Sequence, residues 1–312
     1  MNIETIRQRS TILKLVGFSL CLLVVAIFST TPSLAQTASQ DDLQLTLSPT
    51  STRLEISPGK IYDGSFTIFN SGKEQLKFKV YAAPYQVTSE HYDPTFSNDT
   101  PRTQVSRWVR FEQTNYTVES GKQAEVRYRV SVPQSIPDGG QYAALFAETE
   151  GQSQGSITSI KRVGMLLYAQ AKGTTVEKGT SQVVPIGFWN SSPTFNVIQK
   201  ATNNGNTDFE AKASLHIKDI FGNKKYSADK TSVVLPETTR QIPLEWKDVP
   251  PLGIFTVTSK ATVLGKTIET NKLVLFATPT ALFAVVALFA LIIAGGIYGI
   301  KKRRSKPSFR RR

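Results

Sequence analysis

Hydrophobic and polar residues alternate with a period of two through much of the chain between residues 43 and 268. In residues 76–80, 126–130 and 211–218, apolar side chains alternate with Lys, Arg, Ser or His. Successive side chains of a strand point to opposite faces, so this pattern predicts strands with one buried and one solvated face. Gly and Pro turn signals recur at short intervals, and no long segment with a 3.6-residue period intervenes. The spacing predicts antiparallel β-sandwiches.

An internal repeat divides this β-rich region into two copies. The turn Asn70-Ser71-Gly72 before one alternating run is matched by Asn203-Asn204-Gly205 before another, at an offset of 133 residues. Two later turn-and-strand signals recur in the same order, at offsets of about 118 and 113. We therefore predict two copies of one topology, with Gly72 superposing on Gly205 and Gly140 on Gly253. The largest drop in offset predicts an insertion in the first copy, which we assign to the Pro-, Ser- and Thr-rich loop 88–106.

The C-terminal apolar run predicts a membrane span. No charged residue occurs from Leu273 to Ile300, and a basic tail follows. Proline fits the first turn of a helix, so the helix is expected to begin at Pro279. The 21 residues that follow would extend about 31 Å, close to the hydrocarbon thickness of about 30 Å. The alternative, a buried helix of a large soluble core, is disfavoured by the length of the run. The basic tail places the C-terminus in the cytoplasm and the β-rich region outside.

The N-terminus has the pattern of a secretory signal peptide. Arg7, Arg9 and Lys14 precede an apolar run from Leu15 to Phe28, and small residues stand before a cleavage position ahead of Gln36. An uncleaved span is the alternative, but 14 apolar residues fall short of the roughly 20 that a span needs. We therefore predict export through the membrane.

These signals predict an all-β ectodomain of two tandem immunoglobulin-like β-sandwiches, followed by a single transmembrane α-helix. The expected organisation is a signal peptide (1–35), a leader linker (36–42), a first sandwich (43–172), a linker (173–182), a second sandwich (183–272), a transmembrane segment (273–300) and a basic cytoplasmic tail (301–312).

The net charge of +13 does not indicate a nucleic-acid-binding protein. The tail after Ile300 holds eight basic residues and the first 35 residues have a charge of +2, which leaves only +3 for the exported part. So small an excess gives no basic surface that could follow a phosphate backbone. Cys21 is the only cysteine, so the exported part has no disulfide, thiol nucleophile or thiolate metal site.

The arrangement resembles the WxL-interacting protein family of bacterial surface proteins. The residues that carry this resemblance are Leu54–Gly59, Phe66–Asn70 and Pro137–Tyr142 in the first copy, and Asn203–Asn206, Asp219–Asn223 and Leu235–Arg240 in the second. The resemblance implies two immunoglobulin-like domains with a C-terminal membrane anchor. It also implies a first domain associated with peptidoglycan and a second associated with partner or host proteins.

Candidate binding residues gather around the insertion and one later strand. His91, Tyr92, Phe96 and Trp108 provide a possible glycan or peptide platform, although core and hairpin packing also explains aromatic residues there. The run Gly140–Glu148 is apolar on both faces at positions such as Tyr142 and Ala144. As an exposed edge strand it would accept an extended segment of a partner. The alternative is that both faces are covered.

Catalytic chemistry is weakly supported, so we predict no enzyme, no catalytic residues, no metal and no cofactor. The exported part holds two histidines, His91 and His216, and no cysteine. Glu90 and Asp93 are an alternative pair for glycan hydrolysis, but no convergent set of catalytic groups accompanies them. Leu235–Thr239 resembles a sortase signal without its glycine, and we interpret it as a strand-entry turn.

The sequence therefore predicts a membrane-anchored bacterial surface protein. We expect a non-catalytic module that binds cell-wall polymer (peptidoglycan), another surface protein, or both, and no nucleic acid. The alternative is a structural stalk or assembly scaffold of a membrane complex without a ligand of its own.

Overall fold

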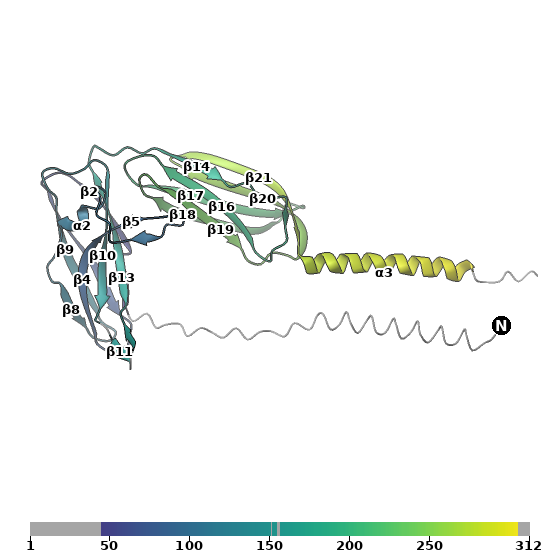
Figure 1. Cartoon of the computed structure of the whole chain (residues 1–312), viewed down its shortest axis with the longest axis horizontal. Coiled ribbons are helices and arrows are strands. Elements are labelled where there is room, and N and C mark those ends of the chain that lie inside the picture. Colours follow the sequence, from purple (N-terminus) through teal and green to yellow (C-terminus); the bar gives the residue numbers. More distant parts are fainter. Residues whose placement is uncertain (1–44, 151, 155–156, 305–312) are drawn as a thin grey trace, which may run out of the picture. The chain divides into compact units, whose positions relative to one another are not determined.

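The computed structural model describes residues 45–150, 152–154 and 157–304, which form β-strands followed by one long helix (Figure 1). The predicted signal peptide and leader linker lie outside the described residues. The strands are β1 (Leu45–Ser48), β2 (Ser51–Ile56), β3 (Ile61–Asn70), β4 (Leu76–Pro84), β5 (Gln86–Val87), β6 (Pro94–Thr95), β7 (Val109–Phe111), β8 (Asn115–Val118), β9 (Gln123–Ser131), β10 (Gly140–Thr149), β11 (Gln152–Gln154), β12 (Ile157–Ser159), β13 (Arg162–Ala171), β14 (Gly179–Val183), β15 (Trp189–Asn190), β16 (Phe195–Asn203), β17 (Phe209–Asp219), β18 (Lys224–Val234), β19 (Thr239–Trp246), β20 (Leu252–Val263) and β21 (Lys266–Ala277). The helices are α2 (Val105–Trp108) and α3 (Pro279–Arg304).

The first pair of sheets encloses its own hydrophobic core. One sheet has the strand order β1-β3-β9-β7 and the other β2-β13-β10-β4-β8. The alternating apolar positions of both sheets meet between them, as at Phe66 and Val126 from one sheet and Phe78 and Leu145 from the other. Strand β2 runs parallel to β13, while the other ladders are antiparallel.

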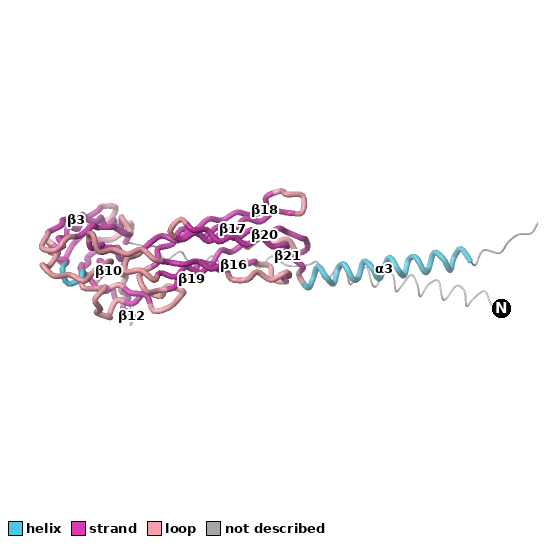
Figure 2. The backbone as a smooth tube through the Cα atoms, turned by 90° about the horizontal axis from the view of Figure 1, so that it is seen from above, coloured by secondary structure: helices cyan, strands magenta, loops and turns pink. Residues whose placement is uncertain are grey.

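The second pair of sheets repeats this plan. Its sheets have the orders β14-β16-β19 and β15-β21-β20-β17-β18, and β15 again runs parallel to β21. Its long strands run side by side (Figure 2). Val197 and Ile242 from one sheet and Leu215 and Phe276 from the other belong to its core. Such two-sheet arrangements are typical of immunoglobulin-like sandwiches.

The two sheet pairs have matching strand orders and equivalent turns, as the predicted repeat requires. Asn70 and Asn203 each donate their side-chain amide to two carbonyls, one four residues later and one on the last residue of β8 or β18. Each asparagine also accepts the N–H of the glycine two residues on, Gly72 or Gly205, at 2.9 Å. The Asn-x-Gly motif therefore forms the same turn, anchored by a buried asparagine, in both copies.

The predicted insertion lies between β4 and β8 but is longer than the sequence indicated. Residues 85–114 join these strands, whereas residues 220–223 join the equivalent strands β17 and β18. The inserted segment holds the β5–β6 hairpin, the short helix α2 and strand β7, so the prediction of a simple loop at 88–106 was incomplete.

Two predicted boundaries were wrong, and the start of the helix was right. Strand β14 begins at Gly179, inside the expected linker, and β21 continues to Ala277, five residues into the expected membrane segment. In residues 273–277, Val274 and Phe276 are apolar because they lie in the core. Apolar content alone does not distinguish a buried strand from a membrane-spanning segment. Helix α3 begins at Pro279. Among the described residues, α3 is the one helix that is long and apolar enough to cross a membrane. The candidate span is Pro279–Tyr298, with a mean hydropathy of 2.6.

One buried amide in the first sheet pair lacks partners. Gln141 is fully buried in β10, and neither polar atom of its side chain has a hydrogen-bond partner within the protein. A buried polar group without a partner costs about 1–3 kcal/mol. Gln141→Met, which has a similar shape, is therefore expected to raise the free energy of unfolding by about 1 kcal/mol. Denaturant unfolding of the full chain in detergent would measure the change, and a loss of stability would show that the amide is satisfied by bound water.

Candidate functional site

The inserted segment packs back onto the outer face of the sheet that contains β10. This face carries a separate apolar cluster that includes Tyr85, Tyr142, Ala144 and Phe146. Phe96 covers the cluster, with its ring edge-to-face on Phe146 at 4.8 Å between centroids. The insertion thus shields apolar surface that would otherwise face water.

Strand β10 is a central strand, so the hypothesis that it is a free docking edge was wrong. It pairs with β13 along Gly140–Glu148 and with β4 along Ala143–Thr149. Its inward side chains join the core between the sheets, and its outward side chains join the covered outer cluster. The alternative expectation, a strand covered on both faces, is confirmed.

Tyr92 of the insertion contacts the second sheet pair. Its hydroxyl accepts a hydrogen bond from the Leu235 N–H and lies 2.9 Å from Thr238 Oγ1. The Arg240 guanidinium lies 4.1 Å from the centre of the Tyr92 ring. Burial raises the pKa of Tyr92, so the phenol stays protonated and can donate to Thr238 while it accepts from Leu235.

Glu90 forms a second contact of the insertion with the same region. Its carboxylate accepts hydrogen bonds from Lys200 Nζ and Gln241 Nε2, both at 2.6 Å. Its backbone carbonyl accepts the Gln241 N–H at 2.7 Å, so the insertion bonds to the edge of β19. The hydrogen bond from Lys200 is the main cause of the lowered pKa of Glu90. Asp93 instead accepts a hydrogen bond from Ser89, so the two carboxylates of the alternative hydrolase pair have different partners.

A buried carboxylate joins the two sheet pairs near the start of β17. The side chain of Asp208 is fully buried and forms an ion pair with Arg53 of β2. It also accepts hydrogen bonds from the Tyr142 hydroxyl at 3.1 Å and from Gln170 Nε2 at 3.2 Å. The Asp208 N–H in turn donates to the Tyr142 hydroxyl at 2.9 Å. Burial, with the nearby Asp208 charge, raises the pKa of Tyr142, which therefore remains a neutral donor.

A cleft of about 570 Å³ opens beside these contacts, and residues of both sheet pairs form its walls. Arg102 lies in its wall, where Nη1 donates to the backbone carbonyls of Asp138 at 2.7 Å and Asn206 at 3.1 Å. Arg102 Nη2 lies 3.2 Å from the Glu237 carboxylate. The full lining is Tyr85, Gln86, Val87, Thr100, Pro101, Arg102, Pro137, Asp138, Tyr142, Leu235, Pro236, Glu237 and Thr238. Apolar walls with a few convergent polar groups are typical of ligand sites.

The structure separates the residues that the sequence singled out. Tyr92, Phe96, Tyr142 and Ala144 belong to or pack against one cluster, while Trp108 lies in the core between the first two sheets. Trp108, Tyr142 and Ala144 are all buried, but Tyr142 lines the cleft and the other two do not, so a direct ligand contact by Trp108 or Ala144 is not supported. His91 is exposed at the turn of the insertion. A ligand role for His91, Tyr92, Phe96 and Tyr142 stays a prediction.

Sequence reasoning missed the charged residues Arg53, Arg102, Asp208 and Glu237. The ion pairs between them join positions far apart in the chain: Arg53 and Asp208 are 155 residues apart, and Arg102 and Glu237 are 135 residues apart. No local pattern signals such pairs. Among residues 45–304 as described, no group of three or more His, Cys, Asp or Glu side chains is placed to hold a metal ion.

The Glu90 contact makes a pH-dependent prediction. The pKa of Glu90 is lowered in the folded state, so its contribution to stability is present above its ordinary pKa of 4.5 and is lost as the pH falls through the folded value. We expect wild type to be more stable than Glu90→Gln at pH 7, and the difference to shrink below pH 4.5. Melting temperatures of both proteins across this range measure it. Asp93→Asn is the matched control, and an unchanging difference would contradict the prediction.

Comparison with known proteins finds no matching family model and no matching curated protein. Solved structures with partial similarity include a chaperone–tip adhesin complex of CFA/I fimbriae biogenesis, at 14% identity and a TM-score of 0.37, covering 75% of this chain and 99% of that one. A CsuC–CsuE pre-assembly complex from Csu pili of Acinetobacter baumannii matches at 12% identity and a TM-score of 0.39, covering 73% and 97%. The E. coli chaperone DraB matches at 12% identity and a TM-score of 0.37, covering 73% and 96%. These scores are too low to assign a function, so the architecture described above rests on strand order and core packing.

Proposed function

We propose that this protein is a membrane-anchored, non-catalytic binding module. Helix α3 crosses the membrane, the two sheet pairs lie outside it, and the module binds cell-wall polymer or another surface protein. The helix is long and apolar enough for this role, and it follows the last strand directly. The predicted signal peptide, the basic tail and the resemblance to the WxL-interacting family support the same organisation.

The observation that carries the proposed binding role is the cleft at the junction of the sheet pairs. Three prolines and Leu235 give it apolar walls, while Arg102, Asp138 and Glu237 add charges of both signs. A peptide segment or an amino-sugar polymer with peptide side chains presents the same mixture of apolar and charged groups. The charges would set orientation and the apolar walls would supply most of the affinity.

Retention assays test this role. The full chain in detergent is incubated with purified wall material and, separately, with surface-protein extracts. We expect retention on one of them, reduced several-fold by Arg102→Ala. Arg129→Ala, which removes an exposed ion pair with Asp63 away from the cleft, is the control and should bind as wild type. No retention on either material would overturn the binding role, and equal retention of both variants would overturn the cleft as its site.

A second candidate function, a stalk or assembly scaffold, is favoured by the contacts between the sheet pairs. Glu90, Tyr92 and Asp208 each bond across the junction, which would keep the two pairs from moving independently. In this case a partner complex would assemble normally with Arg102→Ala but fail when α3 is replaced by an unrelated span. Copurification from native membranes distinguishes the two functions.

A further inference from the structure

Exposed apolar side chains gather at the end of the second sheet pair that leads into α3. Six of them, which we name the apolar base, are Trp189, Ile220, Phe221, Leu252, Ile254 and Leu275. Phe221 is 83% exposed and Ile220 is 62% exposed, both in the turn between β17 and β18. Single exposed apolar residues are ordinary, but a contiguous group marks an interaction surface.

Strand register places these side chains together. Leu252 pairs with Ala277, the last residue before the connection to α3, and Ile254 pairs with Leu275. Trp189 of β15 also pairs with Leu275, from the other side. Asp219 at the end of β17 pairs with Phe255, so the turn that holds Ile220 and Phe221 lies at this same end.

The connection from the last strand to the helix is a single residue. Thr278 donates its N–H to the Pro251 carbonyl at 2.9 Å, and its hydroxyl accepts the Ala281 N–H at 3.3 Å. One residue spans at most about 3.6 Å, whereas the headgroup layer adds roughly 5 Å or more on each side of the hydrocarbon. If α3 begins at the hydrocarbon boundary, the apolar base therefore lies at headgroup depth.

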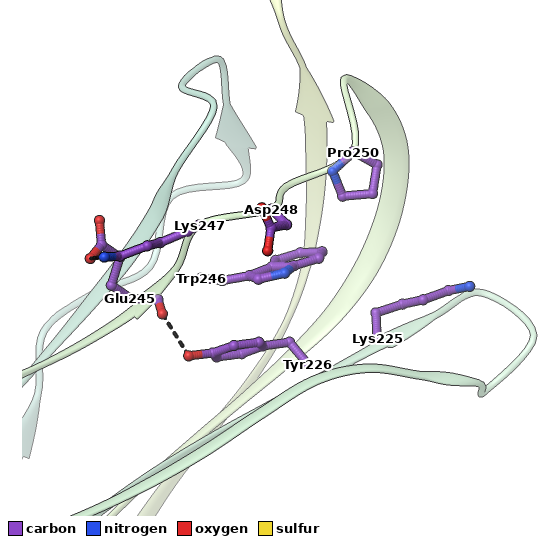
Figure 3. A pocket seen from close by; sticks show the side chains of 7 residues that line it. All are labelled: Lys225, Tyr226, Glu245, Trp246, Lys247, Asp248 and Pro250. Atoms are coloured by element: carbon purple, nitrogen blue, oxygen red, sulfur yellow. Dashed lines mark hydrogen bonds and ion pairs between the residues drawn. The ribbon is translucent and has the colours of Figure 1, made fainter. Parts of the chain in front are cut away.

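Exposed lysines accompany the apolar base. Lys224 is exposed at the start of β18 and Lys225 lies beside it. A cleft of about 530 Å³ adjoins this turn, where the Tyr226 and Trp246 rings stack at 5.9 Å between centroids. Lys225 and Lys247 project in opposite directions from this pair (Figure 3). Trp246 is itself buried in the core, whereas Trp189 is half exposed. An exposed Trp at headgroup level, with Lys near anionic phosphates, is typical of the membrane interface.

We propose that the apolar base inserts into the headgroup layer of an anionic bilayer. Ile220 and Phe221 reach toward the acyl boundary, Trp189 and the Leu and Ile side chains lie in the interface, and Lys224 contacts lipid phosphates. Lys225 is ion-paired with Asp219 at 3.3 Å. The second sheet pair thereby contacts the membrane surface directly, in addition to its covalent connection to α3. This inference rests on the proposed membrane anchoring by α3.

Depth-dependent quenching tests the proposal in the full chain. Cys21→Ser removes the only native thiol, and Phe221→Cys then carries a nitrobenzoxadiazole label. Leu264→Cys is the control, because its turn joins β20 and β21 at the opposite end of the same strands, where Val263 pairs with Lys266. Both proteins are reconstituted in vesicles of phosphatidylcholine and phosphatidylglycerol in equal parts, with and without spin-labelled lipid. We expect several-fold stronger quenching and a blue-shifted emission at position 221.

The outcomes separate this inference from the proposed anchoring. Equal quenching at both positions in protein that resists alkaline carbonate extraction would overturn this membrane contact and leave the anchoring intact. Extraction by carbonate would overturn the anchoring itself. A blue shift at position 221 without quenching by lipid would show that protein covers the base, which also overturns the proposal. Circular dichroism of Phe221→Ser checks folding, which we expect to be unchanged because the side chain is exposed.

Discussion

Replacing Asp208 by alanine is expected to lower the free energy of unfolding by about 3 kcal/mol. Removing one partner of a buried ion pair costs roughly 3–5 kcal/mol, and the lower end applies because Arg53 is 43% exposed and can be solvated. The Tyr142 hydroxyl and the Gln170 amide would also lose their shared acceptor. The main-chain N–H of residue 208 would still donate to Tyr142, which limits the loss.

Denaturant unfolding of the full chain in detergent measures this effect. Asp208→Asn is the matched control, since it keeps the shape and one acceptor oxygen but removes the charge, and we expect roughly half the loss. A change below about 1 kcal/mol for Asp208→Ala would be the size expected of an exposed ion pair and would contradict a buried carboxylate at the junction.

Replacing Ala144 by proline is expected to prevent folding of the first sheet pair. Ala144 lies opposite Leu166 of β13 and Ala83 of β4, so β10 is bonded on both sides at this position. Proline removes a main-chain donor of the ladder. Because Ala144 is fully buried, the packing around it also leaves no space for the larger proline ring. A loss of about 3 kcal/mol or more is expected by comparison with proline inside other regular structure.

Circular dichroism and protease resistance of the full chain report this outcome. Ala144→Gly is the matched control, because it keeps the N–H and is expected to cost only about 1 kcal/mol. A proline variant that folds as well as the glycine variant would show that β10 has a free edge, and the docking hypothesis would then be restored.

The two variants also address how the candidate site is held. Asp208 receives hydrogen bonds from the first sheet pair, and Tyr142, one of its donors, lines the cleft. Loss of binding in the Asp208 variant, with the first sheet pair still folded, would indicate that the cleft depends on the alignment of its two walls. Arg102→Ala, by contrast, removes a residue of the cleft wall itself.

The local sequence determined the β-rich character, the duplicated topology, the site of the insertion and the start of α3. These features depend on short-range physics: the period of two along a strand, the Asn-x-Gly turns at Asn70 and Asn203, and the fit of Pro279 in a first helical turn. The sequence also placed Gly140 and Gly253 at equivalent positions. Each lies two residues before an aromatic residue, Tyr142 or Phe255, whose ring occupies the space that a Cβ would need.

Only the tertiary structure decided what the insertion does and where the candidate site lies. The outward apolar residues of β10 had the same pattern whether they faced a partner or were covered, and the cover comes from Phe96, about fifty positions earlier. Arg53 and Asp208 are 155 positions apart, and no sequence period relates two such residues. The end of β21 was assigned to the membrane segment because burial in a sandwich and burial in lipid select the same uncharged side chains. Local pattern thus determines the elements, whereas long-range packing determines which of their faces remain available to a partner.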